Sequence, residues 1–68
     1  MTYYIIESFG VGPTRRANVI ATADSKADAV ALAHDMFTIV DFEHDALNPH
    51  CADFATACGR VMQIEPYA

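Results

Sequence analysis

The sequence predicts a small α+β domain in which one helix packs on one face of an antiparallel sheet. A stripe of apolar side chains at intervals of three and four residues runs through the middle of the chain. Runs of β-branched and aromatic residues flank the stripe, and short breaks containing Gly or Pro separate these runs. These patterns predict the element order β-β-α-β-β. The stripe consists of Ala29, Leu32, Ala33, Met36, Phe37 and Val40.

Two strands are predicted before the helix. Residues 2–9 are dense in Tyr and Ile and carry apolar side chains on both faces, which suits a central strand or one whose outer face is covered. Residues 10–13 contain two Gly and one Pro and interrupt the pattern as a loop. Residues 15–23 are the second strand, and so short a connection implies antiparallel pairing.

The helix is predicted to begin at Ser25 and to continue to Val40. Ser25 is a preferred N-cap residue, and Asp28 follows three positions later, as in a capping box with Asp in place of Glu. Asp24 and Asp28 also lie near the positive end of the helix dipole. Frequent alanines add helix propensity to this segment.

Residues 41–57 are ambiguous in the sequence. Apolar and acidic residues alternate at first, as in a strand, but the same residues could extend the helix. Pro49 must end whatever element precedes it. Short strands are predicted at residues 52–57 and 60–65, with Pro66 stopping the last one. The alternative order is therefore β-β-α-α-β, in which residues 41–57 are partly helical.

The size of the chain favours self-association. Residues 1–68 have room for one domain, and a chain this short buries only about 60% of the surface that its unfolded form exposes. Because 53% of its residues are hydrophobic, some apolar side chains must remain on the surface. An identical subunit is the commonest partner for such a surface, so we expect a homodimer.

The charge of the chain argues against direct nucleic-acid binding. The formal net charge is −5, and Lys26 is the one Lys or Arg between residues 24 and 45. The negative electrostatic field of these charges repels phosphate groups. The same charges allow an alternative function, in which the protein is an acidic mimic of a nucleic acid. The six acids of this segment are Asp24, Asp28, Asp35, Asp41, Glu43 and Asp45.

Two features predict a cytoplasmic location. Cys51 and Cys58 are too few for a disulfide scaffold and are expected to be reduced thiols. The first residues lack the basic region of a signal peptide, and no apolar run approaches the ~20 residues of a membrane span.

Two residue sets could bind a metal. Asp41, Glu43 and Asp45 offer oxygen ligands that suit a hard cation such as Ca²⁺ or Mg²⁺. Ala46 stands where a calcium-binding loop of this kind requires Gly. A solvated acidic strand edge or helix end explains the three acids without a metal.

The second set lies between residues 44 and 58. His44, His50, Cys51 and Cys58 have the atoms that bind Zn²⁺, but they lack the close ligand pairs of structural zinc sites. His50 and Cys51 are adjacent in sequence, and neighbours on a strand point to opposite faces, which disfavours a nucleophile–base pair. The sequence therefore assigns no catalytic residue, no cofactor and no definite metal site.

By elimination, the sequence predicts a small, non-catalytic interaction or regulatory module that forms a homodimer. The alternatives are a metal-binding protein that uses either set above and an acidic nucleic-acid mimic.

Overall fold

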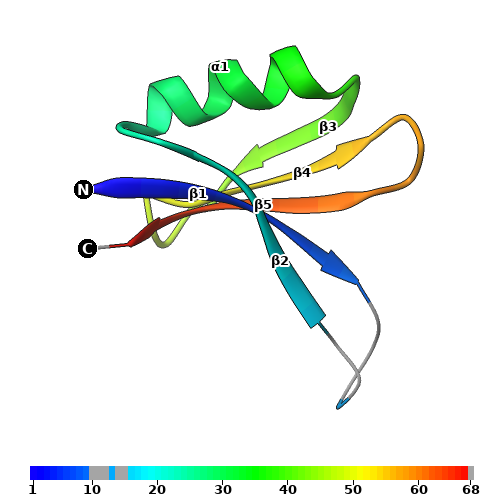
Figure 1. The fold of residues 1–68 in the computed structure, drawn as a ribbon, viewed down its shortest axis with the longest axis horizontal. Coiled ribbons are helices and arrows are strands. Elements are labelled where there is room, and N and C mark those ends of the chain that lie inside the picture. The colour runs from blue at the N-terminus through cyan, green and yellow to red at the C-terminus, as the bar shows by residue number, and fades with distance from the viewer. Residues whose placement is uncertain (10–12, 14–15, 68) are drawn as a thin grey trace.

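The computed structural model describes residues 1–9, 13 and 16–67. The chain forms one five-stranded antiparallel sheet with a single helix on one face (Figure 1), which confirms the predicted α+β class. The elements in chain order are β1 (Thr2–Phe9), β2 (Arg16–Ala23), α1 (Lys26–Met36), β3 (Ile39–His44), β4 (Ala52–Thr56) and β5 (Val61–Tyr67).

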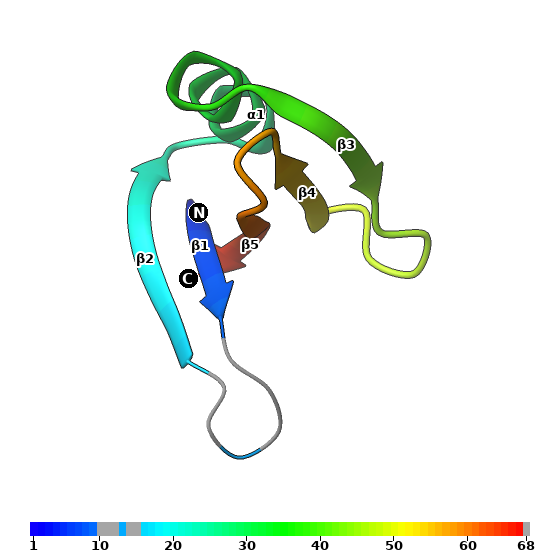
Figure 2. The same ribbon diagram turned by 90° about the vertical axis from the view of Figure 1, so that its right-hand side faces the viewer.

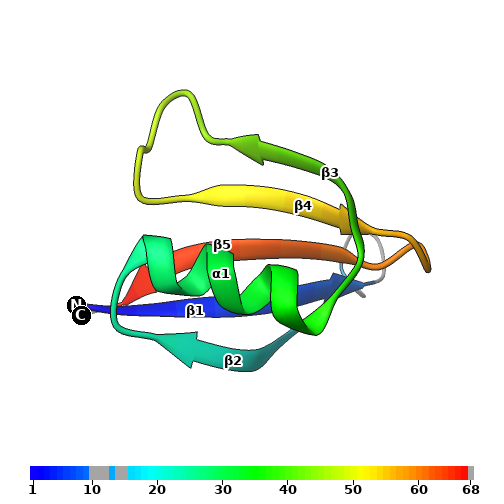
Figure 3. The same ribbon diagram turned by 90° about the horizontal axis from the view of Figure 1, so that it is seen from above.

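The sheet order is β2-β1-β5-β4-β3, so β2 and β3 form the two edges (Figure 3). Because α1 follows β2 and precedes β3, the chain crosses the sheet from one edge to the other. Figure 2 shows that α1 lies on one side of the sheet, and it packs on β1, β2 and β5. The opposite face of the sheet carries no helix of the described residues.

The core lies between α1 and the sheet. Ala29 and Ala33 are the fully buried residues of the helix, and their small side chains let it approach the sheet closely. They pack with Ile5, Met62 and Ile64, the largest fully buried side chains of the described residues. The other core residues are Tyr3, Ala52 and Phe54.

The start of the helix is confirmed, but its predicted end is wrong. Ser25 is the N-cap, and its Oγ accepts a hydrogen bond from the backbone N–H of Asp28 at 3.1 Å. Helix α1 ends at Met36, and Phe37 is the C-cap. Val40 lies instead on β3, where it is 65% exposed and so contributes nothing to the helix–sheet core. β-Branched side chains at positions 38–40 favour the change to extended backbone.

Replacing Ser25 with Ala should lower the free energy of unfolding by about 1 kcal/mol, because the Asp28 N–H loses its acceptor. Urea denaturation followed by circular dichroism measures this change. The Ser25→Asp variant keeps a side-chain acceptor and should remain close to the original stability. An Ala variant as stable as the parent would show that the cap contributes nothing.

A bulge in β2 changes which residues share a face. Ile5 pairs with Ala21, whereas the next residue of β1, Ile6, pairs with Val19. Simple alternation places Val19 and Ala21 on the same face, but the extra residue, Ile20, puts them on opposite faces. Ala21 therefore faces α1, and Val19 faces away from it.

The ambiguous segment is resolved as two strands and a loop. β3 and β4 pair with each other, and residues 45–51 connect them. The alternative order with a second helix is therefore wrong, and the sheet contains one strand more than the order β-β-α-β-β predicts.

The last strand runs past Pro66, contrary to the prediction. β4 begins at Ala52, which pairs with Ile64, so at Pro66 the strand β5 is paired with β1 alone. A proline is tolerated there because its missing N–H would face a position without a neighbouring strand. Of the predicted 10–13 loop, only Pro13 belongs to the described residues, and the first residue of the predicted second strand, Arg15, lies outside them.

Candidate functional site

The predicted acidic triplet is split in the structure. Asp41 and Glu43 share one face of β3, opposite α1. Asp45 lies beyond the end of the strand, where its Oδ1 accepts hydrogen bonds from the backbone N–H groups of Leu47 (2.8 Å) and Asn48 (3.2 Å). Asp45 therefore shapes the β3–β4 loop.

A different carboxylate joins the pair on β3. Asp53 of β4 pairs directly with Glu43, so Asp41, Glu43 and Asp53 line the same hollow of about 170 Å³. Asp53 was not among the predicted site residues, because its position beside Glu43 follows only from the pairing of β4 with β3. Three carboxylates in an open hollow can attract cationic groups. Within the described ranges, however, no three His, Cys, Asp or Glu side chains are arranged so that they could hold a metal ion together.

The structure separates the proposed zinc ligands. His44 Nδ1 accepts a hydrogen bond from Lys26 Nζ at 2.9 Å, and a 2.9 Å hydrogen bond joins His50 Nδ1 to the Tyr3 hydroxyl. Cys51 precedes β4, whereas Cys58 lies in the turn beyond its far end.

Lys26 connects the first turn of α1 to the end of β3 and to the β3–β4 loop through two hydrogen bonds. Its Nζ donates both to His44 Nδ1 and to the carbonyl oxygen of Pro49, at 2.7 Å. Together with the Tyr3–His50 hydrogen bond, these contacts give both histidines a structural role. The sequence gives little sign of this arrangement, because Lys26 and His44 are 18 residues apart.

Neither cysteine resembles an activated nucleophile paired with a histidine. Burial, reinforced by the nearby carboxylates of Glu65 and Asp45, raises the pKa of the Cys51 thiol, which is the opposite of thiolate activation. A hydrogen bond with the Thr56 hydroxyl (3.2 Å) lowers the pKa of the exposed Cys58 thiol. The hydrogen-bond partner of Cys58 is thus a threonine hydroxyl, which cannot serve as its base.

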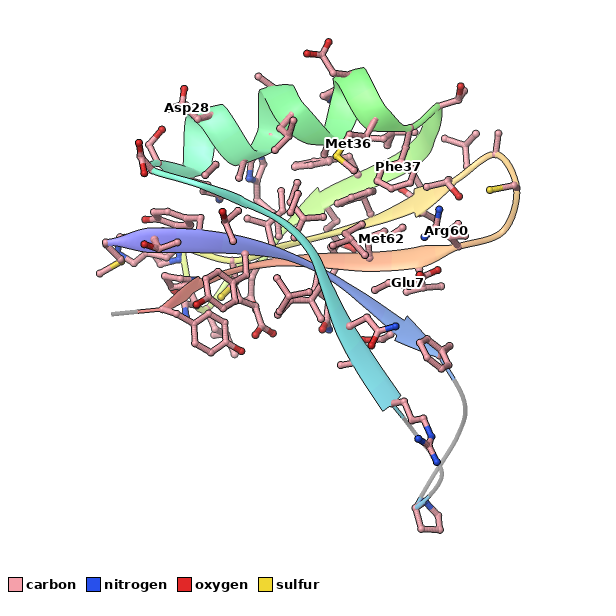
Figure 4. The ribbon with its side chains drawn as sticks, in the orientation of Figure 1. Glu7, Asp28, Met36, Phe37, Arg60 and Met62 are labelled. Atoms are coloured by element: carbon pink, nitrogen blue, oxygen red, sulfur yellow. The ribbon has the colours of Figure 1, made fainter. Side chains whose placement is uncertain are left out.

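One ion pair ties the β4–β5 turn to β1. Arg60 donates through Nε and Nη2 to the two carboxylate oxygens of Glu7, at 2.7 and 2.8 Å. Its guanidinium also lies 5.0 Å from the ring centre of Phe37, and Figure 4 shows Arg60 between Glu7 and Phe37. The hydrogen bond from Arg60 lowers the pKa of the Glu7 carboxyl.

This ion pair predicts a defined pH dependence. Because the pKa of Glu7 is lower in the folded state than the ordinary 4.5, the charged carboxylate stabilises the fold above that value. The contribution is lost as the pH falls through the lowered pKa. The parent should therefore be more stable than Glu7→Gln near neutral pH, and the difference should shrink in acid.

Urea denaturation at a series of pH values measures this difference. The Arg60→Gln variant removes the partner of Glu7. It should also be less stable than the parent near neutral pH, and this difference in the free energy of unfolding should shrink in acid. A gap between parent and Glu7→Gln that stays constant from neutral to acidic pH would contradict the assignment.

The face of the sheet opposite α1, called the uncovered face below, retains apolar side chains. Val19 of β2 and Val61 of β5 are 52% and 54% exposed, so more than half of each side chain meets solvent. Ile6 lies on the same face of the strand between them, but it is only 6% exposed, so its neighbours already cover it. Nearby, the rings of Tyr4 and Tyr67 stack with their centres 4.5 Å apart.

Charge divides the uncovered face into two halves. The acids of this face lie on β3, β4 and β5, whereas the part formed by β1 and β2, called the acid-free half below, has none among the described residues. The acids are Asp41, Glu43, Asp53 and Glu65.

Comparison of the chain with protein-family models, with curated proteins and with solved structures gives no match. Within the described ranges, no helix has the length and apolar character needed to cross a membrane.

Proposed function

We propose that this protein is a non-catalytic interaction module that works as a homodimer, and that it associates through the acid-free half of the uncovered face. One observation carries the proposal: α1 covers a single face of the sheet, while Val19, in the acid-free half of the other face, remains 52% exposed. Burying exposed apolar surface of this kind is the main driving force of association.

The charge distribution supports the choice of surface. With a formal net charge of −5, two copies repel each other most strongly where acids face acids. Association through β1 and β2 would keep Asp41, Glu43 and Asp53 of each copy away from the contact. A cytoplasmic location is part of the proposal, and it is supported by the unpaired thiols of Cys51 and Cys58.

Analytical ultracentrifugation from micromolar to submillimolar concentration tests the proposal. We expect a reversible monomer–dimer equilibrium for the parent protein. Val19→Glu adds an acid to the contact and should shift the equilibrium to monomer. Val40→Glu is the matched control, because Val40 is also exposed on an edge strand but lies on β3, and it should dimerise like the parent.

Circular dichroism establishes that both variants are folded before they are compared. A parent protein that sediments as a monomer over the whole range would overturn the homodimer. Equal weakening by both substitutions would overturn the choice of the acid-free half.

An acidic nucleic-acid mimic is the second candidate function. It is favoured by the four acids of the uncovered face, three of which line one hollow. Such a mimic would bind a basic nucleic-acid-binding protein with an affinity that falls steeply with salt. Glu43→Gln together with Asp53→Asn would weaken that binding and leave a homodimer of the kind proposed above unchanged.

A further inference from the structure

Histidines take part in two of the hydrogen bonds that attach the end of β3 and the β3–β4 loop to the rest of the fold. At the end of β3, His44 Nδ1 lies 2.9 Å from Lys26 Nζ of α1. Within the loop, His50 Nδ1 lies 2.9 Å from the hydroxyl of Tyr3 on β1. Both histidines are exposed, so protons from solvent can reach their rings. Histidine is also the side chain whose charge ordinarily changes between pH 5 and 8.

Protonation affects the two contacts differently. The Lys26 ammonium has donors only, so His44 must accept through an Nδ1 that carries no proton. A protonated imidazole is a donor at both nitrogens, so charging His44 removes the acceptor and places two positive charges side by side. The Tyr3 hydroxyl can donate or accept, so its hydrogen bond with His50 survives protonation with the roles exchanged.

The side chains closest to His44 leave its charged form without a compensating partner. Asp45 follows it in the chain, but the Asp45 Oδ1 already accepts hydrogen bonds from two N–H groups of the loop. No carboxylate in the described part of the chain forms an ion pair with His44 or Lys26. Phe42 contacts the His44 ring edge-on, and His34 of α1, which also gains positive charge in acid, stacks on the same Phe42 ring.

The other ionisable groups around the contact supply no negative charge to it. Glu43 and Asp53 lie on the opposite face of the sheet from His44. Asp28 of α1 points away from the sheet (Figure 4). Burial raises the pKa of the Cys51 thiol, so this group is neutral below pH 8. His50 itself gains positive charge over the same pH range as His44.

We propose that the contact between His44 and Lys26 is a pH-sensitive switch: protonation of His44 separates the end of β3 from the first turn of α1, while the contact between Tyr3 and His50 persists. The contact stabilises the fold above the pH range in which the imidazole is protonated, and it is lost as the pH falls through that range. The adjoining loop carries Leu47, which is 97% exposed, so the switch changes how this side chain is held relative to α1. The proposal does not depend on the homodimer.

A double-mutant cycle between Lys26 and His44 tests the switch. Lys26→Met removes the ammonium and keeps a long side chain, and His44→Phe removes the acceptor but keeps a ring against Phe42. At pH 8, the coupling of the two side chains should raise the folding equilibrium constant about threefold, as expected of an exposed pair. At pH 5, the same factor should fall to one or below. Urea denaturation at one protein concentration gives these constants.

The Tyr3–His50 contact is the matched control, with the substitutions Tyr3→Phe and His50→Phe. Its coupling factor should stay above one at both pH values, because the hydroxyl can accept from the charged ring. A Lys26–His44 factor that is the same at pH 8 and pH 5 would overturn the switch. An equal fall of both factors would overturn the assignment of the switch to His44 alone.

Nuclear magnetic resonance of the parent protein tests the same geometry without any substitution. Nuclear Overhauser effects between the Lys26 side chain and the His44 ring should be present at pH 8 and absent at pH 5. Those between the rings of Tyr3 and His50, whose centres lie 6.3 Å apart, should be present at both. Lys26–His44 effects that persist at pH 5 with His44 protonated would show that the contact does not open.

Discussion

Replacing Phe54 with Ala should remove a large share of the protein's free energy of unfolding. Phe54 is 3% exposed, and its ring centre lies 6.2 Å from that of Phe42 and 6.3 Å from that of Phe37. Truncating a buried Phe to Ala typically costs about 3–5 kcal/mol, through lost burial and the cavity left behind. At roughly 0.05–0.15 kcal/mol per residue, a chain of 68 residues has about 3–10 kcal/mol in total.

Far-UV circular dichroism and urea denaturation at one fixed protein concentration measure this loss, since dimerisation would make stability depend on concentration. Phe9→Ala is the matched control, because Phe9 carries the same side chain on β1 but is 45% exposed. A Phe54→Ala variant no less stable than Phe9→Ala would show that the core is not centred between α1 and the sheet.

Local sequence patterns predicted the features that do not depend on contacts with distant parts of the chain. The strand at residues 2–9 follows from its many Tyr and Ile residues, and the N-cap at Ser25 depends on one hydrogen bond within a turn. Both predictions are confirmed. The helix end was not predictable in the same way. The apolar stripe continues through Val40, but Val40 contributes an exposed strand residue rather than a helix contact.

Contacts between distant residues explain the other differences. Whether residues 41–57 form helix or strand depends on pairing with β5, which the segment itself does not encode. Tyr3 and His50 are 47 residues apart, and Glu7 and Arg60 are 53 apart, so no spacing rule could find them. Of the candidate site, the sequence predicted Asp41 and Glu43 but not Asp53.

The expected surplus of apolar surface depends on topology rather than on composition alone. The sequence indicates that some apolar side chains must stay exposed, but not which ones. Because α1 connects the two edge strands across one face, no helix of residues 1–9, 13 and 16–67 covers the other face. The bulge at Ile20 then directs Val19 to that face.

The close contact of α1 with the sheet makes Ala33 intolerant of a larger side chain. Ala33 is fully buried, on the face of α1 that packs with the sheet. Ala33→Leu must displace neighbouring side chains or lift the helix, and overpacking of this kind costs about 1–3 kcal/mol. Ala31→Leu makes the same change on the exposed side of α1, with nearly the same helix propensity, so it should leave stability almost unchanged.

Urea denaturation compares the two leucine variants, and amide hydrogen exchange shows whether α1 is the element that loosens. Faster exchange in α1 of Ala33→Leu, with the β1–β5 amides still protected, is the expected pattern. Equal stability of the two variants would mean that space exists beneath the helix. The substitution does not touch the uncovered face, so the folded Ala33→Leu variant should keep the dimer dissociation constant of the parent, whereas a dimer formed through α1 would be weakened.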